Sequence, residues 1–177
     1  NDKLIAVIGV VILVIASIGI YTWKPGETMQ HLSSIDDFFV VSSSISDLPD
    51  AVAVSDADPF YALIATPLAV HYNAEGKQEI IPMYFQNYSN PSRAISRAEE
   101  QIDIAANEFI DDSRSVKEWS IELAKKYWSS SEAALIIENN ESGYNLGVMA
   151  TPLASYLSIP IIVTDELDHQ IREVFNE

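Results

Sequence analysis

The chain has 177 residues, of which 48% are hydrophobic, and its formal net charge at pH 7 is -16. Its ten Lys and Arg residues are spread thinly, so the composition excludes nucleic-acid binding, which needs clustered basic side chains. Because the sequence has no cysteine, it excludes disulfides, thiolate metal sites and cysteine catalysis. A chain of this length can bury one moderate hydrophobic core or two small ones.

The first predicted element is a transmembrane helix. The run from Leu4 to Trp23 has no charged residue and is dominated by Ile, Val and Leu. A helix of that length spans roughly 30 Å, the thickness of a bilayer's hydrocarbon core. Tyr21 and Trp23 suit the membrane interface, and Pro25 and Gly26 end the helix. We therefore expect residues 1–24 to form an anchor that contacts the lipid bilayer through residues 4–23.

A cleaved signal peptide and a buried core helix are the alternatives to an anchor. The run is longer than a signal peptide requires, and only Ser17-Ile18-Gly19 resembles a cleavage site. Lys3 and Lys24 flank the run, so the positive-inside rule gives no clear orientation. Asn87 and Asn140 begin candidate glycosylation patterns, which place the domain outside the cell. The prediction is a single-pass cell-membrane protein with an extracytoplasmic soluble domain.

Between the anchor and residue 90, apolar runs predict short strands around one helix. The predicted strands are Phe38 to Val41, ended by Ser42 to Ser46, then Ala51 to Val54, and Ile80 to Phe85. Phe60 to Tyr72 predicts a helix after an acidic loop. In this helix Thr66 either caps a new helix that begins at Pro67 or precedes a kink at that proline.

The second half alternates helices with strands. The predicted helices are 91–110, which is amphipathic, 115–128, which is broken by Ser129 to Ser131, then 143–157 and 166–176; the predicted strands are 133–137 and 159–164. Strands that alternate with helices require crossover connections and hence parallel sheets. The predicted fold class is α/β, with an N-terminal transmembrane helix followed by two related small parallel-sheet modules.

A repeated pentapeptide supports the division into two modules. Ala-Thr-Pro-Leu-Ala occurs at residues 65–69 and again at 150–154, each time after an apolar run and a polar loop and before a second apolar run. Such self-similarity indicates a duplicated unit. We expect an anchor over 1–24, a divergent α/β repeat over 25–90, and a second repeat over 91–177 that is incomplete at its C-terminal end.

The second repeat resembles the cell wall-binding repeat 2 family. The resemblance lies in the helix end Leu123 to Trp128, the strand Ala133 to Ile137, the pentapeptide helix and the strand Ile159 to Thr164. It covers about 60 residues, and the first repeat matches only in part. The family resemblance implies tandem α/β modules that hold a protein on the anionic polymers of the cell wall. The loop between strand and helix departs from the family pattern, and the chain has two copies where the family usually has three.

The candidate ligand-binding residues lie in the two loops between strand and helix. They are Asp56 and Asp58 in the first loop and Glu138, Asn140 and Glu141 in the second. In parallel α/β sheets, ligands collect at the carboxyl ends of strands, and carboxylate oxygens suit Ca²⁺ or Mg²⁺ if a metal binds. Solvated acidic loops are the alternative interpretation.

Other polar residues have simpler expected roles. His31, His71 and His169 have no metal-ligand spacing, and we expect each at the surface or on the side of a helix. Asp165, Asp168 and His169 form a small acidic group that could bind a cation, although capping of the last helix by Thr164 or Asp165 is the favoured interpretation. No catalytic motif occurs, so we expect neither an enzyme nor a resident cofactor or metal.

These features predict a membrane-anchored cell-surface protein that binds an envelope polymer or a surface-layer protein without catalysis. One alternative is a filament or lattice subunit assembled through the N-terminal hydrophobic helix, and a homo-oligomer is compatible with both functions. The other alternative is a small-molecule-binding or enzymatic α/β domain that uses the acidic loops. A deep pocket holding titratable groups with shifted pKa values would favour this last function.

Overall fold

A computed structural model describes residues 43–73 and 76–174. The predicted anchor over residues 1–24, its lipid contact through 4–23, and the predicted strand Phe38 to Val41 lie outside the described residues. Among the residues that are described, no helix combines the length and the apolar character that a bilayer crossing requires.

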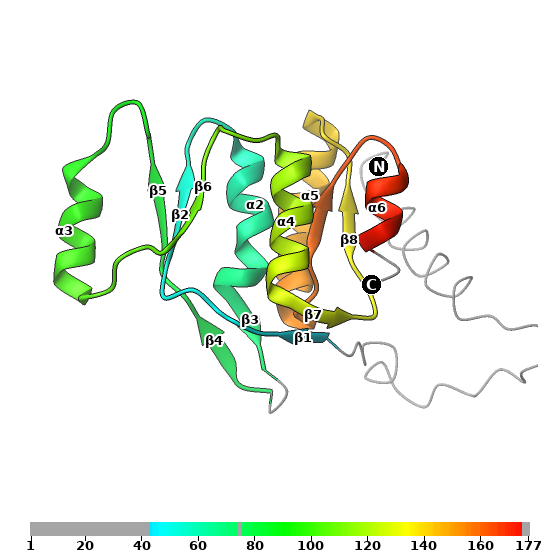
Figure 1. Ribbon diagram of the computed structural model, residues 1–177, viewed down its shortest axis with the longest axis horizontal. Helices are drawn as coiled ribbons and strands as arrows, with labels where there is room; N and C mark the ends of the chain where they lie inside the picture. Colours follow the sequence, from blue (N-terminus) through cyan, green and yellow to red (C-terminus); the bar gives the residue numbers. More distant parts are fainter. Residues whose placement is uncertain (1–42, 74–75, 175–177) are drawn as a thin grey trace, which may run out of the picture. The chain divides into compact units, whose positions relative to one another are not determined.

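The first half builds a three-stranded parallel sheet. Its strands are β2 (Val52–Ser55), β5 (Met83–Gln86) and β6 (Glu108–Ile110), in the order β5-β2-β6 (Figure 1). In the central strand β2, Val52 pairs with Met83 of β5 on one side and with Glu108 of β6 on the other. Helix α2 (Pro59–Ala69) connects β2 to β5 through an antiparallel hairpin of β3 (Val70–Tyr72) and β4 (Gln78–Ile80).

The second half contains another parallel pair. Strands β8 (Leu135–Ile137) and β9 (Ile161–Val163) lie on either side of α5 (Glu141–Leu157) in the chain and pair in parallel. The remaining elements are β1 (Ser43–Ile45), α3 (Arg93–Ile102), α4 (Val116–Tyr127), β7 (Trp128–Ser131) and α6 (His169–Val174). The described residues therefore form a mixed α/β fold, and the parallel pairing predicted from the sequence is confirmed for β2 with β5 and for β8 with β9, while β6 adds a third parallel strand that the sequence does not predict.

Two serine-rich segments form strands that the sequence does not predict. The expected break at Ser42 to Ser46 is wrong, because Ser43–Ile45 forms β1. Ser129 to Ser131 end the preceding helix as expected, but they also belong to β7, which pairs antiparallel with β1. The Ser129 hydroxyl adds a hydrogen bond to the Ser44 carbonyl at 3.2 Å. Pairing between distant segments here overrides weak local strand preference.

The predicted helix 60–72 and strand 80–85 need correction. Helix α2 ends at Ala69, and the next three residues form β3 of the hairpin. The predicted strand is divided at Ile81 and Pro82 between β4 and β5, since proline has no amide hydrogen for a sheet ladder. The Pro82 carbonyl instead accepts a hydrogen bond from Val52 N at 2.9 Å. Pro67 lies inside one continuous helix that Asp58 caps, so the interpretation of Thr66 as a cap is wrong.

The predicted amphipathic helix 91–110 is also too long. Helix α3 ends at Ile102, where Asp103 adopts a left-handed conformation with φ 55° that terminates the helix. The following residues lead into β6, a strand that the sequence analysis missed. None of the residues of α3 is buried, so its apolar stripe does not cover the core.

Both pentapeptides lie inside helices and share one local geometry. The Thr66 hydroxyl donates to the Ala62 carbonyl and the Thr151 hydroxyl donates to the Gly147 carbonyl, both at 2.7 Å. Their packing differs, because Leu68 is fully buried whereas Leu153 is 39% exposed. The two copies therefore have equivalent backbone positions and unlike surroundings.

Both halves contribute to a single main hydrophobic cluster. Its buried members come from β2, α2, β6, α4, β8, α5 and β9 and include Val54, Ile64, Leu68, Ile110, Leu123, Tyr127, Ile137, Ile161 and Val163. Helix α2 contacts α4, α5, β2 and β9, so it connects the two parallel sheets. A methyl group on Gly147 of α5 would lie 3.0 Å from the Leu63 side chain, which shows how closely α5 approaches α2.

Ser158 joins the end of α5 to three other elements. It adopts a left-handed conformation with φ 55°. Its hydroxyl donates to the Tyr72 carbonyl at 2.6 Å and accepts from Tyr72 N at 3.1 Å. Its carbonyl accepts from the Ser43 hydroxyl and from Trp128 Nε1, both at 2.6 Å. The β1-β7 pair and the hairpin are thus fixed to the helix that carries the second pentapeptide.

Helix α5 begins very close to the main chain of Glu138, and substituting Gly143 tests this contact. In Gly143→Ala, the new Cβ would lie 2.0 Å from the main-chain oxygen of Glu138, which cannot move without distorting the loop. We expect a loss of about 1–3 kcal/mol of unfolding free energy, the usual cost of overpacking. Urea denaturation measures this loss, with Ser142→Ala at the neighbouring exposed position as the control. Equal midpoints for the two variants would contradict the geometry.

Candidate functional site

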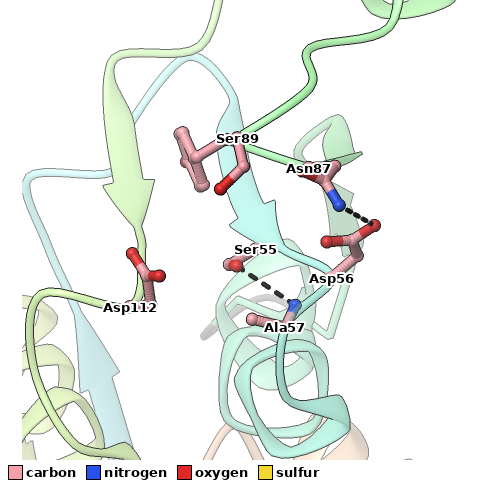
Figure 2. A pocket seen from close by; sticks show the side chains of 7 residues that line it. Ser55, Asp56, Ala57, Asn87, Ser89 and Asp112 are labelled. Carbon is pink, nitrogen blue, oxygen red and sulfur yellow. Dashed lines mark hydrogen bonds between the residues drawn. The ribbon is translucent and has the colours of Figure 1, made fainter.

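The loops that follow β2, β5 and β6 meet at the carboxyl edge of the three-stranded sheet, where parallel α/β sheets bind ligands. They border an open hollow of about 250 Å³, shown in Figure 2. Its lining residues are Ser55, Asp56, Ala57, Asn87, Tyr88, Ser89 and Asp112. Because most of these side chains are polar, the hollow offers hydrogen-bonding groups rather than an apolar surface.

Hydrogen bonds fix one wall of the hollow. Asn87 Nδ2 donates to Asp56 Oδ2 at 3.3 Å (Figure 2). Asn87 Oδ1 accepts from Asn90 N at 2.9 Å. At the base, the Ser55 hydroxyl accepts from Ala57 N at 3.2 Å. The Asn87 amide is therefore held in one orientation beside an exposed carboxylate.

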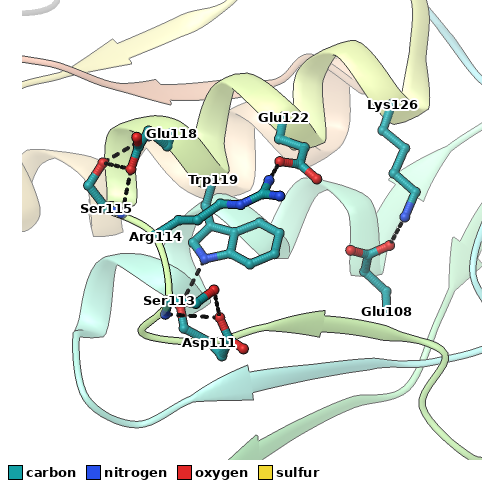
Figure 3. A network of polar contacts seen from close by, with 9 residues as sticks. All are labelled: Glu108, Asp111, Ser113, Arg114, Ser115, Glu118, Trp119, Glu122 and Lys126. Atoms are coloured by element: carbon teal, nitrogen blue, oxygen red, sulfur yellow. Dashed lines mark hydrogen bonds and ion pairs between the residues drawn. The ribbon is translucent and has the colours of Figure 1, made fainter.

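Asp112 lies in the loop after β6, across Ser55 from Asp56 in Figure 2. Its carboxylate is exposed and receives no hydrogen bond from the residues that the structure describes. The neighbouring Asp111 holds the loop in place, because its carboxylate accepts from Ser113 N at 3.0 Å and from the Ser113 hydroxyl. The Asp111 carbonyl accepts from Trp119 Nε1 at 2.8 Å (Figure 3). Asp112 therefore offers hydrogen-bond acceptors from a loop that these contacts hold in place.

Residues at the N-terminus of α4 restrain the loop that carries Asp112. Ser115 and Glu118 form a reciprocal capping box, in which Ser115 N donates to Glu118 Oε2 at 2.9 Å (Figure 3). Arg114 pairs with Glu122 and lies 4.9 Å from the centre of the Trp119 ring. The Arg114–Glu122 pair is exposed and therefore contributes little by itself. The capping box and the buried Trp119 ring carry most of the restraint on the loop.

A buried carboxylate anchors the other end of β6. Glu108 is buried, and its Oε2 accepts from Lys126 Nζ and from the Tyr127 hydroxyl. Burial, and next the hydrogen bond to Glu108, raise the pKa of Tyr127 well above its ordinary value. Removing one partner would leave a buried polar group unpaired, so this group secures β6 against α4.

The edge of the sheet has a negative potential. Burial raises the pKa of Tyr88 to about 12, and the Asp111 charge adds to this effect. Burial also raises the pKa of Tyr61, with further contributions from Asp58, Asp112 and Asp111 in that order. Burial is the larger cause in both cases, and the smaller contributions come from carboxylates near the two phenols. The hollow therefore disfavours anions and accepts neutral or cationic groups.

Of the predicted site residues, Asp56 alone lines the hollow. Asp58 accepts from Phe60 N at 2.9 Å and caps α2. In the second loop, Asn140 accepts from Gly143 N at 2.8 Å and caps α5, while its Nδ2 donates to Glu138 at 2.9 Å. Glu141 is the exposed first residue of α5, where a negative charge suits the helix dipole. Asp58, Asn140 and Glu141 therefore stabilise the N-termini of α2 and α5.

The sequence analysis missed Asp112, Ser55, Tyr88 and Ser89 as lining residues. Asp112 follows β6, a strand hidden inside the predicted helix 91–110. Asn87 is predicted from the sequence only as a glycosylation site, although it follows a predicted strand in the same way as Asp56 follows β2. Both candidate glycosylation sites, Asn87 and Asn140, are exposed. Their amide nitrogens donate to Asp56 and Glu138, respectively.

The remaining polar predictions have mixed outcomes. His31 lies outside the described residues, and His169 is exposed at the start of α6. The prediction for His71 is wrong, because it is a buried strand residue that contacts the Leu68 carbonyl at 3.0 Å. Capping of the last helix by Thr164 or Asp165 is also wrong, since Asp168 accepts from Ile171 N at 3.1 Å. Asp168 also pairs with Lys117.

A Ca²⁺ or Mg²⁺ site in the acidic loops has no support from the described residues. Within residues 43–73 and 76–174, no group of three or more His, Asp or Glu side chains could hold a metal ion. Comparisons of the chain with protein-family models, curated proteins and solved structures found no match in any of the three. The resemblance to the cell wall-binding repeat 2 family therefore rests on the residues named in the sequence analysis.

The Asp111–Ser113 pair gives a pH-dependent prediction. The Ser113 hydroxyl is the largest cause of the lowered pKa of Asp111. These hydrogen bonds to the ionised Asp111 carboxylate therefore stabilise the fold above the ordinary pKa of aspartate, and their contribution is lost as the pH falls through the lowered value. Ser113→Ala should raise the pKa of Asp111 and weaken the loss of stability on acidification.

The measurement is an NMR titration of the Asp111 carboxyl carbon, together with urea denaturation across the acid range. Ser96→Ala on the exposed face of α3 is the matched control. An Asp111 pKa that is the same in Ser113→Ala and the wild type would contradict the assigned cause.

Proposed function

We propose that this chain is a membrane-anchored, extracytoplasmic cell-surface protein that binds a neutral envelope polymer without catalysis. The hollow at the carboxyl edge of β5-β2-β6 carries the proposal. It is open, and it is lined by carboxylate, amide and hydroxyl groups from three loops. Polymers rich in hydroxyl and acetamido groups offer donors to Asp56 and Asp112 and acceptors to Asn87.

The charge of the chain restricts the polymer. A net charge of -16 and the carboxylates around the hollow repel polyanions such as phosphate-containing wall polymers. This differs from the anionic polymers that the family resemblance implies. A neutral polymer of N-acetylhexosamine meets the chemistry of the hollow better, because each unit presents hydroxyl and amide groups and no charge.

The membrane anchor rests on the apolar run over residues 4–23. It would hold the binding domain at a surface, where many weak contacts with a polymer add up through high effective concentration. A protein at such a surface needs only a shallow recognition site with modest affinity per contact. The open hollow suits that role.

One experiment separates the two parts of this function. The full chain, incorporated in uncharged phospholipid vesicles, should sediment with beads that carry a neutral N-acetylhexosamine polymer. Asp56→Asn combined with Asp112→Asn should reduce polymer binding about tenfold and leave vesicle association unchanged, because two acceptors are lost. Deletion of residues 1–24 should abolish vesicle association and leave polymer binding in place.

Glu138→Gln is the matched control for charge removal at an exposed loop outside the hollow. Equal polymer binding by the double variant and the wild type would contradict the assigned site. Binding to an anionic polymer but not to the neutral one would contradict the polymer class. Vesicle association that persists without residues 1–24 would contradict the anchor.

A further inference from the structure

Helix α5 has its apolar face on the outside. Its buried residues are small or polar: Gly143, Gly147, Thr151, Ala154 and Ser155. Four large apolar side chains lie at the surface, with exposures of 45% for Leu146, 65% for Met149, 39% for Leu153 and 60% for Tyr156, whereas Tyr144 and Leu157 pack against the core. We name these four residues the α5 seam. A soluble helix normally has the opposite arrangement, and a contiguous exposed apolar patch of this kind is typical of an interaction surface.

The spacing of the seam is that of a helix that packs on another helix. Its residues follow one another at intervals of three, four and three positions, which place them in one stripe. Tyr156 is held in position by an edge-to-face contact with Tyr72, whose ring centre lies 5.4 Å away. The seam is therefore a pre-ordered surface rather than a set of scattered apolar residues.

Charge indicates the kind of partner. Glu141 is the only charged residue of α5, in a chain with net charge -16. Two copies of such an acidic chain repel each other at most surfaces, but they can meet at the seam without placing carboxylates together. A lipid surface fits less well, because interfacial helices have Lys and Arg around their apolar face and α5 has none.

We propose that the α5 seam binds the α5 seam of a second copy, with the two helices antiparallel. In this arrangement Leu146 packs on Tyr156 of the second copy and Met149 packs on Leu153, so every seam residue has an apolar partner. The same patch on both copies satisfies twofold symmetry.

The position of Glu141 favours the antiparallel direction. In a parallel pair, the two Glu141 side chains and the two positive helix ends would lie side by side. In the antiparallel pair the two carboxylates lie about 30 Å apart, well beyond the screening length at physiological salt. The four side chains of each seam make a small contact compared with stable interfaces, which bury about 1,200–2,000 Å² in total. The pair is therefore a reversible one.

Because the chain has no native cysteine, disulfide cross-linking can test this geometry directly. The full chain is prepared as Leu146→Cys with an affinity tag and as Tyr156→Cys without one, and the two are mixed in detergent and oxidised. We expect tagged–untagged dimers in the mixture and little dimer from either variant alone. The reason is that identical positions lie about 15 Å apart in the antiparallel pair, beyond disulfide reach.

Ser96→Cys, at an exposed position on α3, measures cross-linking by chance collision or through the anchor. The mixture should exceed this background by about tenfold. A mixture that cross-links no faster than the Ser96→Cys chain overturns the proposal, as expected if lipid or another protein covers the seam. Faster cross-linking of Leu146→Cys alone overturns the antiparallel arrangement.

A charge introduced into the seam provides the second test. Met149→Glu in both cysteine variants should reduce cross-linking to the background, since two carboxylates would then face the apolar seam. Leu167→Glu places the same charge at another exposed apolar residue, 58% exposed, outside α5 and should have no effect. Circular dichroism checks that both variants fold. Cross-linking that survives Met149→Glu overturns the proposal.

Discussion

The described fold depends on the burial of helix α2. Eight of its eleven residues are buried, and it contacts β2 of one parallel sheet, β9 of the other, and both α4 and α5. Because α2 is apolar on most sides, it is stable only when all these neighbours are present. The close approach of α5 at Gly147 completes its surroundings. The two strand-helix-strand units therefore share one core, and neither has a complete hydrophobic interior of its own.

This constraint explains both candidate interaction surfaces. Helix α2 packs on the three-stranded sheet, and Glu108 of β6 bonds to Lys126 and Tyr127 of α4. The loops after β2, β5 and β6 border one hollow, and the capping box at Ser115 restrains the loop that carries Asp112. Close packing of α5 on α2 requires small residues on the inner face of α5. Its large apolar residues consequently lie outside. The polar hollow and the α5 seam are thus separate products of one core, and they suit different partners.

Regular patterns in the sequence predicted the parallel strands and most helices, because β2, β9 and α4 have strong local signals. The sequence did not predict β1, β7 or β6, since these strands depend on partners distant in the chain. The missing β6 also hid Asp112, so only Asp56 of the hollow was predicted as a ligand residue. Asp58 and Asn140 look like ligands in the sequence because Asp and Asn also favour helix caps. The repeated pentapeptide predicted equivalent helices but not their unequal burial.

Native-state hydrogen exchange of the full chain tests the shared core most directly. The amides of Val54 in β2 and Val163 in β9 lie in the two different parallel sheets. If α2 joins both sheets into one cooperative unit, these amides should exchange with the same free energy of opening, equal to that of global unfolding. If β9 opens at least about 1.4 kcal/mol below β2, a tenfold difference in opening, the two halves are independent modules and the account of a shared core is wrong.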